Sequence, residues 1–272
     1  IANCLFAKFN SICNADITVG KVELQDCSTG ITYTVEDSAG AIPLILPEQS
    51  EFMGDGLTLH PRPDHRHATS DDVISLASLA KSRNIDFNLE GNPFSEEFKK
   101  FMGFNNLVEV CQPEQITLVP DMPDQITSDH GWESGDHDQK LRESVRLLKS
   151  LSSNSQISLF VDQLKGDKAN IDIIDYAQNI GVDGIEIHTG QFSKSIESGD
   201  LSIISSLSEL VLKANSTHLF VNAGHDLNLI NLPELIKIGG INEVSIGHAV
   251  IVDALKNGFE DTIKSYINTI KE

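Results

Sequence analysis

From residue 56 to the C-terminus, short apolar segments alternate with longer segments of helical spacing, and this alternation constrains the fold more than any other feature. A strand that is followed by a helix and a second strand usually forms a right-handed crossover between parallel neighbours. Seven apolar segments of strand length are present, at residues 56–60, 86–90, 115–119, 157–161, 184–188, 217–222 and 243–247. The sequence therefore predicts an α/β protein with a parallel sheet.

The segments between these strands carry apolar residues at the three- and four-residue spacing of an amphipathic helix. After one of them, Gly181 occupies the position where a left-handed residue commonly ends a helix. Helices are predicted at residues 71–82, 138–151, 169–180, 201–214 and 249–270. The order of the elements is thus a series of β/α units.

Two parallel architectures fit this order, an eightfold β/α barrel and a doubly wound open sheet. The open sheet would carry a G-x-G-x-x-G turn after its first strand, and no such turn is present in the sequence. Seven strands are one short of a (β/α)8 TIM barrel. We therefore expect one TIM-barrel domain over residues 1–272, with strands 2–8 in residues 52–272 and an atypical N-terminal segment in residues 1–51.

Residues 1–51 should supply the missing strand, yet their pattern differs from that of the rest of the chain. Their strand-like segments lie at 22–24, 31–35 and 42–46, with Gly20, Gly30 and Gly40 between them. Three of the four cysteines also fall in this part. This spacing resembles a small β-meander more than one barrel strand followed by a helix.

The charge of the chain narrows the range of its partners. Lys and Arg number 20 against 40 Asp and Glu, which gives a formal net charge of −20. Such a balance argues against nucleic acid and anionic membrane surfaces as partners. A small phosphorylated substrate can still be held by backbone N–H groups and one or two arginines. No stretch has the ~18 consecutive apolar residues of a membrane helix, and residues 1–13 lack a signal-peptide core, so the expected compartment is the cytoplasm.

Histidines stand at the ends of four strand-like segments: His60, His188, His225 and His248. In a β/α barrel the carboxyl ends of the strands converge on one mouth, where the chemistry takes place. Two carboxylates join the histidines. Glu90 ends the second predicted strand, while Glu186 shares a strand face with His188 and is expected to point into the barrel. A carboxylate in the interior is costly unless it is paired or takes part in catalysis.

The segment HPRPDHRH at residues 60–67 is dense in cationic side chains and imidazoles. It is either a solvated loop or a binding site for an anion, in which Arg62 and His67 would hold a phosphate. The segment SIGHAV leads from the last strand into a helix, and its N–H groups together with Gly247 would form a phosphate cradle. Thr127 could bind substrate or cap a helix, and the sequence does not separate these roles.

The motifs together resemble the pyridoxine 5′-phosphate synthase family, whose members are barrel enzymes that close the ring of vitamin B6. The resemblance begins near residue 52 and continues to the C-terminus. It rests on GLTLHPRPDHRH (56–67), FNLE (87–90), TLVPDMPDQITSDHGW (117–132), ISLFVD (157–162), GIEIHTG (184–190), VNAGHDL (221–227) and EVSIGHA (243–249). The combination of HPRPDxRH, VNAGH and IGHA is the specific part of this pattern.

This resemblance implies the condensation of 1-deoxy-D-xylulose 5-phosphate with 3-amino-2-oxopropyl phosphate, without a metal or an organic cofactor. It implies that His60 and Glu90 accept protons and that His225 donates one. Glu186 would stabilise the charged transition state. The implied substrate-binding residues are Arg62, His67 and Thr127 for the pentulose phosphate, and Asp226, Gly247 and His248 for the aminoketone phosphate or the product. The family forms ring-like octamers, which implies a homo-oligomer.

One feature of the family is missing from the chain. The family's first strand reads V-N-x-[DN]-[HK], followed by L-R-x-x-R-G, and no such motif occurs in residues 1–51. One alternative is therefore a barrel homologue that keeps its phosphate sites but has lost turnover. Another is a metal-dependent hydrolase that uses the rim histidines. Such enzymes carry H-x-H on an early strand, whereas His65 and His67 lie in a predicted loop.

Overall fold

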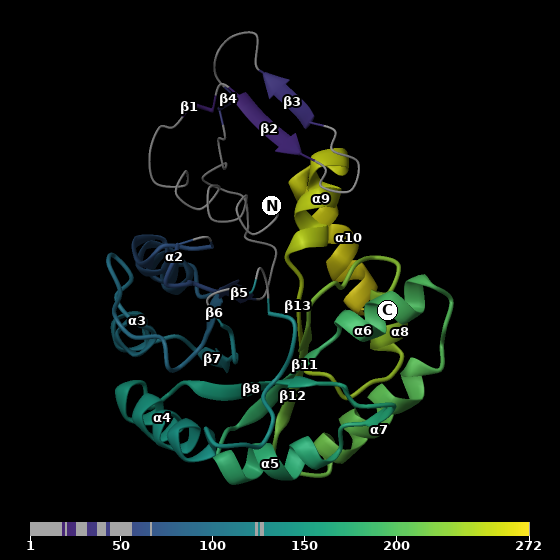
Figure 1. Cartoon of the computed structure of the whole chain (residues 1–272). Coiled ribbons are helices and arrows are strands. Elements are labelled where there is room, and N and C mark those ends of the chain that lie inside the picture. The colour runs from purple at the N-terminus through teal and green to yellow at the C-terminus, as the bar shows by residue number, and fades with distance from the viewer. Residues whose placement is uncertain are drawn as a thin grey trace.

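The computed structural model describes residues 18–19, 21–25, 32–36, 42–43, 56–65, 67–122, 125 and 128–271. Its main feature is a sheet of seven strands in the order β13-β12-β11-β8-β7-β6-β5, in which every neighbouring pair is parallel (Figure 1). The strands are β5 (Gly56–Leu59), β6 (Asp86–Gly91), β7 (Gln115–Leu118), β8 (Gln156–Asp162), β11 (Gly184–His188), β12 (Phe220–Gly224) and β13 (Glu243–Ser245). The predicted parallel α/β architecture is confirmed.

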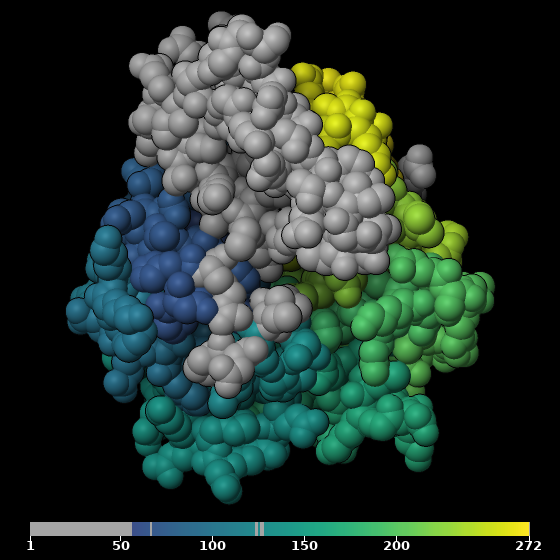
Figure 2. Space-filling view, turned by 45° about the horizontal axis from the view of Figure 1, so that its top comes forward, coloured from purple at the N-terminus to yellow at the C-terminus, as the bar shows by residue number. Residues whose placement is uncertain are grey.

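Helices lie around the outside of the strands (Figure 1). They are α2 (Ser70–Ser82), α3 (Phe104–Cys111), α4 (Asp138–Leu151), α5 (Asp172–Ile180), α6 (Gly190–Glu197), α7 (Ile203–Asn215), α8 (Leu232–Ile236), α9 (His248–Asn257) and α10 (Phe259–Lys271). Figure 2 shows the blue residues of α2 and α3 and the green residues of α6 to α8 on opposite sides of the molecule. The helical layer therefore surrounds the sheet as it does in a β/α barrel.

Glycines explain two helix ends, one predicted and one not. Gly181 ends α5 in the left-handed conformation at φ 92°, which confirms its predicted role. Gly258, at φ 83°, separates α9 from α10, so the single helix predicted over residues 249–270 is wrong. A β-carbon makes such a backbone conformation costly, and glycine adopts it freely. The helices α3, α6 and α8 were not predicted at all.

The seven-stranded sheet is curved until its two edges approach each other. From the edge strand β13, Glu243 accepts a hydrogen bond at 2.6 Å from the side-chain amide of Gln115 on β7, across the interior. A Cβ atom on Gly56 of the other edge strand would lie 3.7 Å from the carboxylate oxygen Oε1 of Glu243. The sheet is therefore nearly closed into a barrel.

The described strands of the N-terminal segment form two small antiparallel pairs. β2 (Lys21–Gln25) pairs with β3 (Thr32–Glu36), and β1 (Thr18–Val19) pairs with β4 (Ile42–Pro43). The predicted strand character of this segment is confirmed. None of these four strands joins the parallel sheet, so the expected eighth barrel strand has no counterpart among the described residues.

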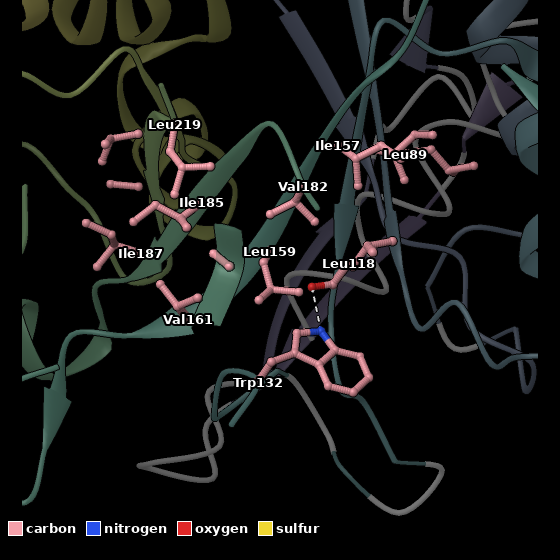
Figure 3. Close-up of a cluster of buried hydrophobic side chains, with 14 of the residues drawn as sticks. Leu89, Leu118, Trp132, Ile157, Leu159, Val161, Val182, Ile185, Ile187 and Leu219 are labelled. Carbon is pink, nitrogen blue, oxygen red and sulfur yellow. Dashed lines mark hydrogen bonds between the residues drawn. The ribbon is translucent and has the colours of Figure 1, made fainter. Parts of the chain in front are cut away.

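The outward side of the strands packs against the helices and forms the hydrophobic core. Four aliphatic side chains, each from a different strand, have no exposed surface: Leu89, Leu118, Leu159 and Ile185 (Figure 3). Trp132 lies at the edge of this core, and its indole Nε1 donates a hydrogen bond to the carbonyl oxygen of Leu118 at 2.9 Å (Figure 3). Burial of these apolar surfaces supplies the main driving force for the fold, and it leaves the inward-facing positions available for polar residues.

Candidate active site

The ends of β5, β6 and β7 bring three titratable side chains together. His60 directly follows β5, Glu90 is the penultimate residue of β6, and Asp121 follows β7 by three residues. The Nδ1 atom of His60 lies 3.2 Å from Oε1 of Glu90, and its Nε2 atom lies 2.6 Å from Oδ2 of Asp121. The His60 side chain is 14% exposed, and each carboxylate is 8% exposed. The imidazole is thus enclosed between two carboxylates.

Arg62 extends this cluster along the loop that follows β5. Its Nη2 atom lies 2.9 Å from the same Oδ2 atom of Asp121, and its Nη1 atom donates a hydrogen bond to the backbone carbonyl of Gln125. His67 packs edge-on against His60, with ring centroids 5.6 Å apart. Arg62 and His67 are both buried. The solvated-loop alternative therefore does not hold for the two residues expected to bind an anion.

The proximity of opposite charges sets the protonation states in this cluster. Burial alone would lower the pKa of His60, but the charge of Glu90 and the contacts with Asp121 outweigh it and raise the pKa to about 9. For Asp121, burial is likewise outweighed, here by His60 and Arg62, and the pKa falls to about 2. His67 is different, because burial and the neighbouring cations His60 and Arg62 lower its pKa to about 4. At neutral pH, His60 is therefore an imidazolium and His67 a neutral imidazole.

The pKa values of the two interior glutamates are shifted in opposite directions. Burial opposes ionisation of Glu90, but His60 outweighs it and lowers the pKa of this carboxyl. For Glu186, burial and then the charge of Glu90 raise the pKa well above its ordinary value. Glu186 therefore holds its proton to a higher pH than Glu90 does. Carboxyl groups whose environments drive their pKa values apart are suited to separate acid and base roles.

A hydrogen-bonded network fixes Glu186 inside the barrel. The hydroxyl of Thr117 on β7 lies 3.2 Å from Oε2 of Glu186 on β11 and 3.2 Å from the side-chain oxygen of Asn88 on β6. The hydroxyl of Ser158 on β8 donates to that of Thr117 at 3.0 Å. All four side chains are buried. The predicted inward orientation of Glu186 is thus what the structure shows, with Thr117 as its hydrogen-bond partner and Asn88 and Ser158 holding Thr117 in place.

His225 lies in a strained turn that directly follows β12. Its φ is 85° and that of Asp226 is 56°, conformations that are uncommon for residues other than glycine. Thr189 anchors this turn, because its buried hydroxyl lies 2.6 Å from the carbonyl oxygens of both Gly224 and His225. Burial lowers the pKa of His225, so the ring is neutral near pH 7. The turn holds a neutral imidazole at the mouth of the barrel.

His188 connects this turn to β8. Its Nδ1 atom lies 3.2 Å from Oδ1 of Asp162, and its ring meets that of His225 edge-on with centroids 5.1 Å apart. Phe160 packs against both imidazoles, with centroid separations of 5.4 Å and 4.9 Å. His188 therefore supports His225 from the neighbouring strand.

The structure brings together most, but not all, of the residues singled out in the sequence. His60, Glu90, Arg62 and His67 form one cluster, and the charges of Glu90 and His60 act on both Glu186 and His225. Asp226, Gly247 and His248 are exposed at the mouth side of their strands. Thr127 lies outside the described residues.

Three further residues belong to the site, and the sequence indicated the position of two of them. Asp121 and Asp162 follow apolar strand segments, which is the same signal that singled out His60, so both are expected near the mouth, although the sequence assigned them no role. Thr189 carries no such signal, because its two carbonyl partners lie 35 and 36 residues further along the chain. Long-range hydrogen bonds of this kind become visible only in the folded chain.

The described residues contain no group of three or more His, Cys, Asp or Glu side chains that could hold a metal ion. Within the same part of the chain, each helix is too short or too polar to span a lipid bilayer.

Comparison with known proteins shows which family this chain resembles. The sequence profile described as "Pyridoxal phosphate biosynthesis protein PdxJ" matches residues 45–272. A pyridoxine 5′-phosphate synthase from Xanthomonas axonopodis pv. citri is 38% identical over 218 residues, covering 79% of this chain and 82% of that protein. A second protein of that name, from Xylella fastidiosa, is 38% identical over 217 residues, covering 79% and 80% respectively.

Among solved structures, the deoxyribose phosphate aldolase from Aeropyrum pernix is similar at a TM-score of 0.48 and 14% identity, covering 76% of this chain and 92% of that one. The sequence relatives are far closer, and they match in the region that carries the barrel strands and the titratable cluster. On that ground the chain belongs to the family of the pyridoxal phosphate biosynthesis protein PdxJ.

Proposed function

We propose that this protein is a pyridoxine 5′-phosphate synthase. In this proposal it condenses 1-deoxy-D-xylulose 5-phosphate with 3-amino-2-oxopropyl phosphate and releases pyridoxine 5′-phosphate, phosphate and water. The observation that carries the proposal is the cluster at the barrel mouth, in which His60 and Glu90 lie 3.2 Å apart beside the buried Arg62. The names of the relatives support the same activity.

The reaction requires imine formation, dehydration and ring closure, each of which moves protons. Glu90, whose pKa is lowered, can accept a proton. The raised pKa of Glu186 favours its protonated form, which can donate a hydrogen bond to an oxygen that gains negative charge. The neutral ring of His225 carries one N–H that it can donate. His60 must release a proton before it can accept one, because it is an imidazolium in this arrangement.

The two phosphates of the substrates would occupy two separate sites at the mouth. Arg62 offers a planar guanidinium that matches the geometry of phosphate oxygens, and His67 and Thr127 would complete this site. Gly247 and His248 begin α9, whose first N–H groups favour an anion. Together with Asp226 they would hold the second phosphate or the product. The proposed reaction uses no metal and no organic cofactor.

One observation favours a second candidate, a homologue that binds phosphorylated ligands without turnover. The first-strand motif of the family is missing from residues 1–51, and the described strands of that segment lie outside the parallel sheet. The test is to incubate the purified protein with both substrates in the presence of a chelator and to measure pyridoxine 5′-phosphate and released phosphate. Product in the presence of the chelator supports the synthase. Substrate binding without product supports the second candidate, and activity that the chelator abolishes contradicts both.

We also infer from the family resemblance that the protein works as a cytoplasmic homo-oligomer. Light scattering of the purified protein measures its mass directly. A mass near that of eight chains would match the octamers of the family, and a monomer would contradict the inference.

A further inference from the structure

The two nitrogens of His60 both face carboxylate oxygens. Nδ1 lies 3.2 Å from Glu90 and Nε2 lies 2.6 Å from Asp121. An ionised carboxylate only accepts hydrogen bonds, and a neutral imidazole has a single N–H to donate. Both contacts are therefore favourable at once only when both ring nitrogens carry protons.

The oxygen of Asp121 that faces His60 also faces Arg62. Oδ2 lies 2.6 Å from Nε2 of His60 and 2.9 Å from Nη2 of Arg62. The Arg62 side chain is 5% exposed and that of Asp121 8% exposed, so water screens these charges only weakly. Asp121 is thus the shared counter-anion of two cations, one of which is proposed to hold a substrate phosphate.

We propose that Asp121 is a positioning residue with two linked effects: it holds His60 as a doubly protonated imidazolium, and it competes with the substrate phosphate for Arg62. The second effect rests on the proposed function, which identifies the anion. A phosphate that binds Arg62 takes the guanidinium from Asp121, and this carboxylate is then left to pair with His60 alone. The imidazolium is therefore kept in the resting enzyme and held more firmly when phosphate binds, so His60 must give up that proton before it can accept another.

Several other charged groups act on His60, and they limit the size of the effect. Glu90 on β6 is the second carboxylate in contact and remains after Asp121 is removed. Arg62 and His67 lie on the same loop as His60. The charge of His60 also interacts with Glu186 on β11 and with His225 in the turn after β12. Loss of Asp121 should therefore lower the pKa of His60 from about 9 without returning it to a fully unpaired value.

The first test is a titration of isotopically labelled histidine followed by nuclear magnetic resonance. In the wild-type protein at about pH 7.5, both nitrogens of His60 should carry protons, and a single protonated nitrogen would overturn the proposal. In Asp121→Asn the pKa of His60 should fall by about one unit or more, and in Asp121→Glu it should lie closer to that of the wild type. An unchanged pKa in folded Asp121→Asn would also overturn the proposal.

The second test measures binding of inorganic phosphate by calorimetry. Asp121→Asn should bind phosphate about tenfold more tightly than the wild type, because the internal competitor at Arg62 is lost. The control is Asp129→Asn, which removes the same charge from the same loop. Asp129 is 63% exposed and contacts His130 instead of Arg62, so its removal should change phosphate affinity by less than about twofold.

Equal phosphate affinity in the two variants would overturn the competition for Arg62. Neither test requires turnover. If both give the expected results and no pyridoxine 5′-phosphate forms, the proposed function fails while the role of Asp121 stands.

Discussion

The carboxyl group of Glu186 lies directly against the backbone of Gly224. A Cβ atom on Gly224 would lie 2.5 Å from Oε1 of Glu186, a separation that real Cβ atoms essentially never show. The two residues belong to the neighbouring strands β11 and β12. The missing side chain of Gly224 therefore creates the space in which a buried carboxyl can lie at the centre of the barrel.

This contact predicts the effect of Gly224→Ala. The added methyl group would push Glu186 away from Thr117, and we expect the free energy of unfolding to fall by about 1–3 kcal/mol. Glu186→Ala frees the space, so Gly224→Ala should cost much less in that background. Urea denaturation of the four proteins measures this coupling, and additive losses would show that the two residues do not clash.

The raised pKa of His60 predicts a change of stability with pH. The pKa is about 9 in the folded protein, against an ordinary value of 6.5 for histidine. His60 therefore stabilises the fold fully below about pH 6.5, by about 3 kcal/mol, and this contribution is lost as the pH rises through about 9. The difference in unfolding free energy between the wild type and His60→Gln should shrink between about pH 6 and pH 9.5. A difference that stays constant over this range would contradict the ion-pair arrangement.

The position of His225 at the barrel mouth predicts how much kcat falls when its imidazole is removed. His225→Ala should lower kcat by about a hundredfold or more, the usual contribution of a general acid. His218 is the matched control, because it precedes β12 at the opposite end of the strand and is exposed. His218→Ala should change kcat by less than about twofold. Steady-state assays of product formation compare the two, and equal losses would place the chemistry elsewhere.

Thr189 is expected to act through the backbone of His225. Thr189→Val removes the hydroxyl that lies 2.6 Å from two carbonyl oxygens of the turn. We expect kcat to fall by about tenfold with little change in KM, because the imidazole loses its fixed position. Thr189→Ser keeps the hydroxyl and should restore most of the activity. If the serine variant is as impaired as the valine variant, the hydroxyl is not what positions His225.

Gly131 should be intolerant of any side chain. A Cβ atom there would lie 2.4 Å from the Cα atom of Val161 and 2.5 Å from the backbone nitrogen of Asp162. Because both obstacles are backbone atoms, Gly131→Ala should destabilise the protein by about 2–3 kcal/mol. Gly135 is the control, since its nearest obstacle is the ring of His137 at 3.5 Å. Thermal unfolding of both alanine variants should separate them, and a neutral Gly131→Ala would refute the close packing.

Much of the fold could be predicted because its signals are local. Apolar segments of strand length and helices of regular spacing lie next to each other in the chain, and the strand at 184–188 and the helix at 138–151 match the structure residue for residue. The break at Gly258 was missed because the apolar pattern continues across it. The short helix α8, of five residues, offers too little periodicity to be recognised.

For the candidate site, too, one part could be predicted from the sequence and another could not. The sequence alone determined that His60, Glu90, Glu186 and His225 would meet at one mouth, because parallel β/α units place the carboxyl ends of all strands on the same side. Only the tertiary structure decided their charges. Whether a buried side chain is ionised depends on which opposite charge lies within a few ångströms, and it was folding that placed Asp121 at 2.6 Å from His60 and left Glu186 beside Glu90.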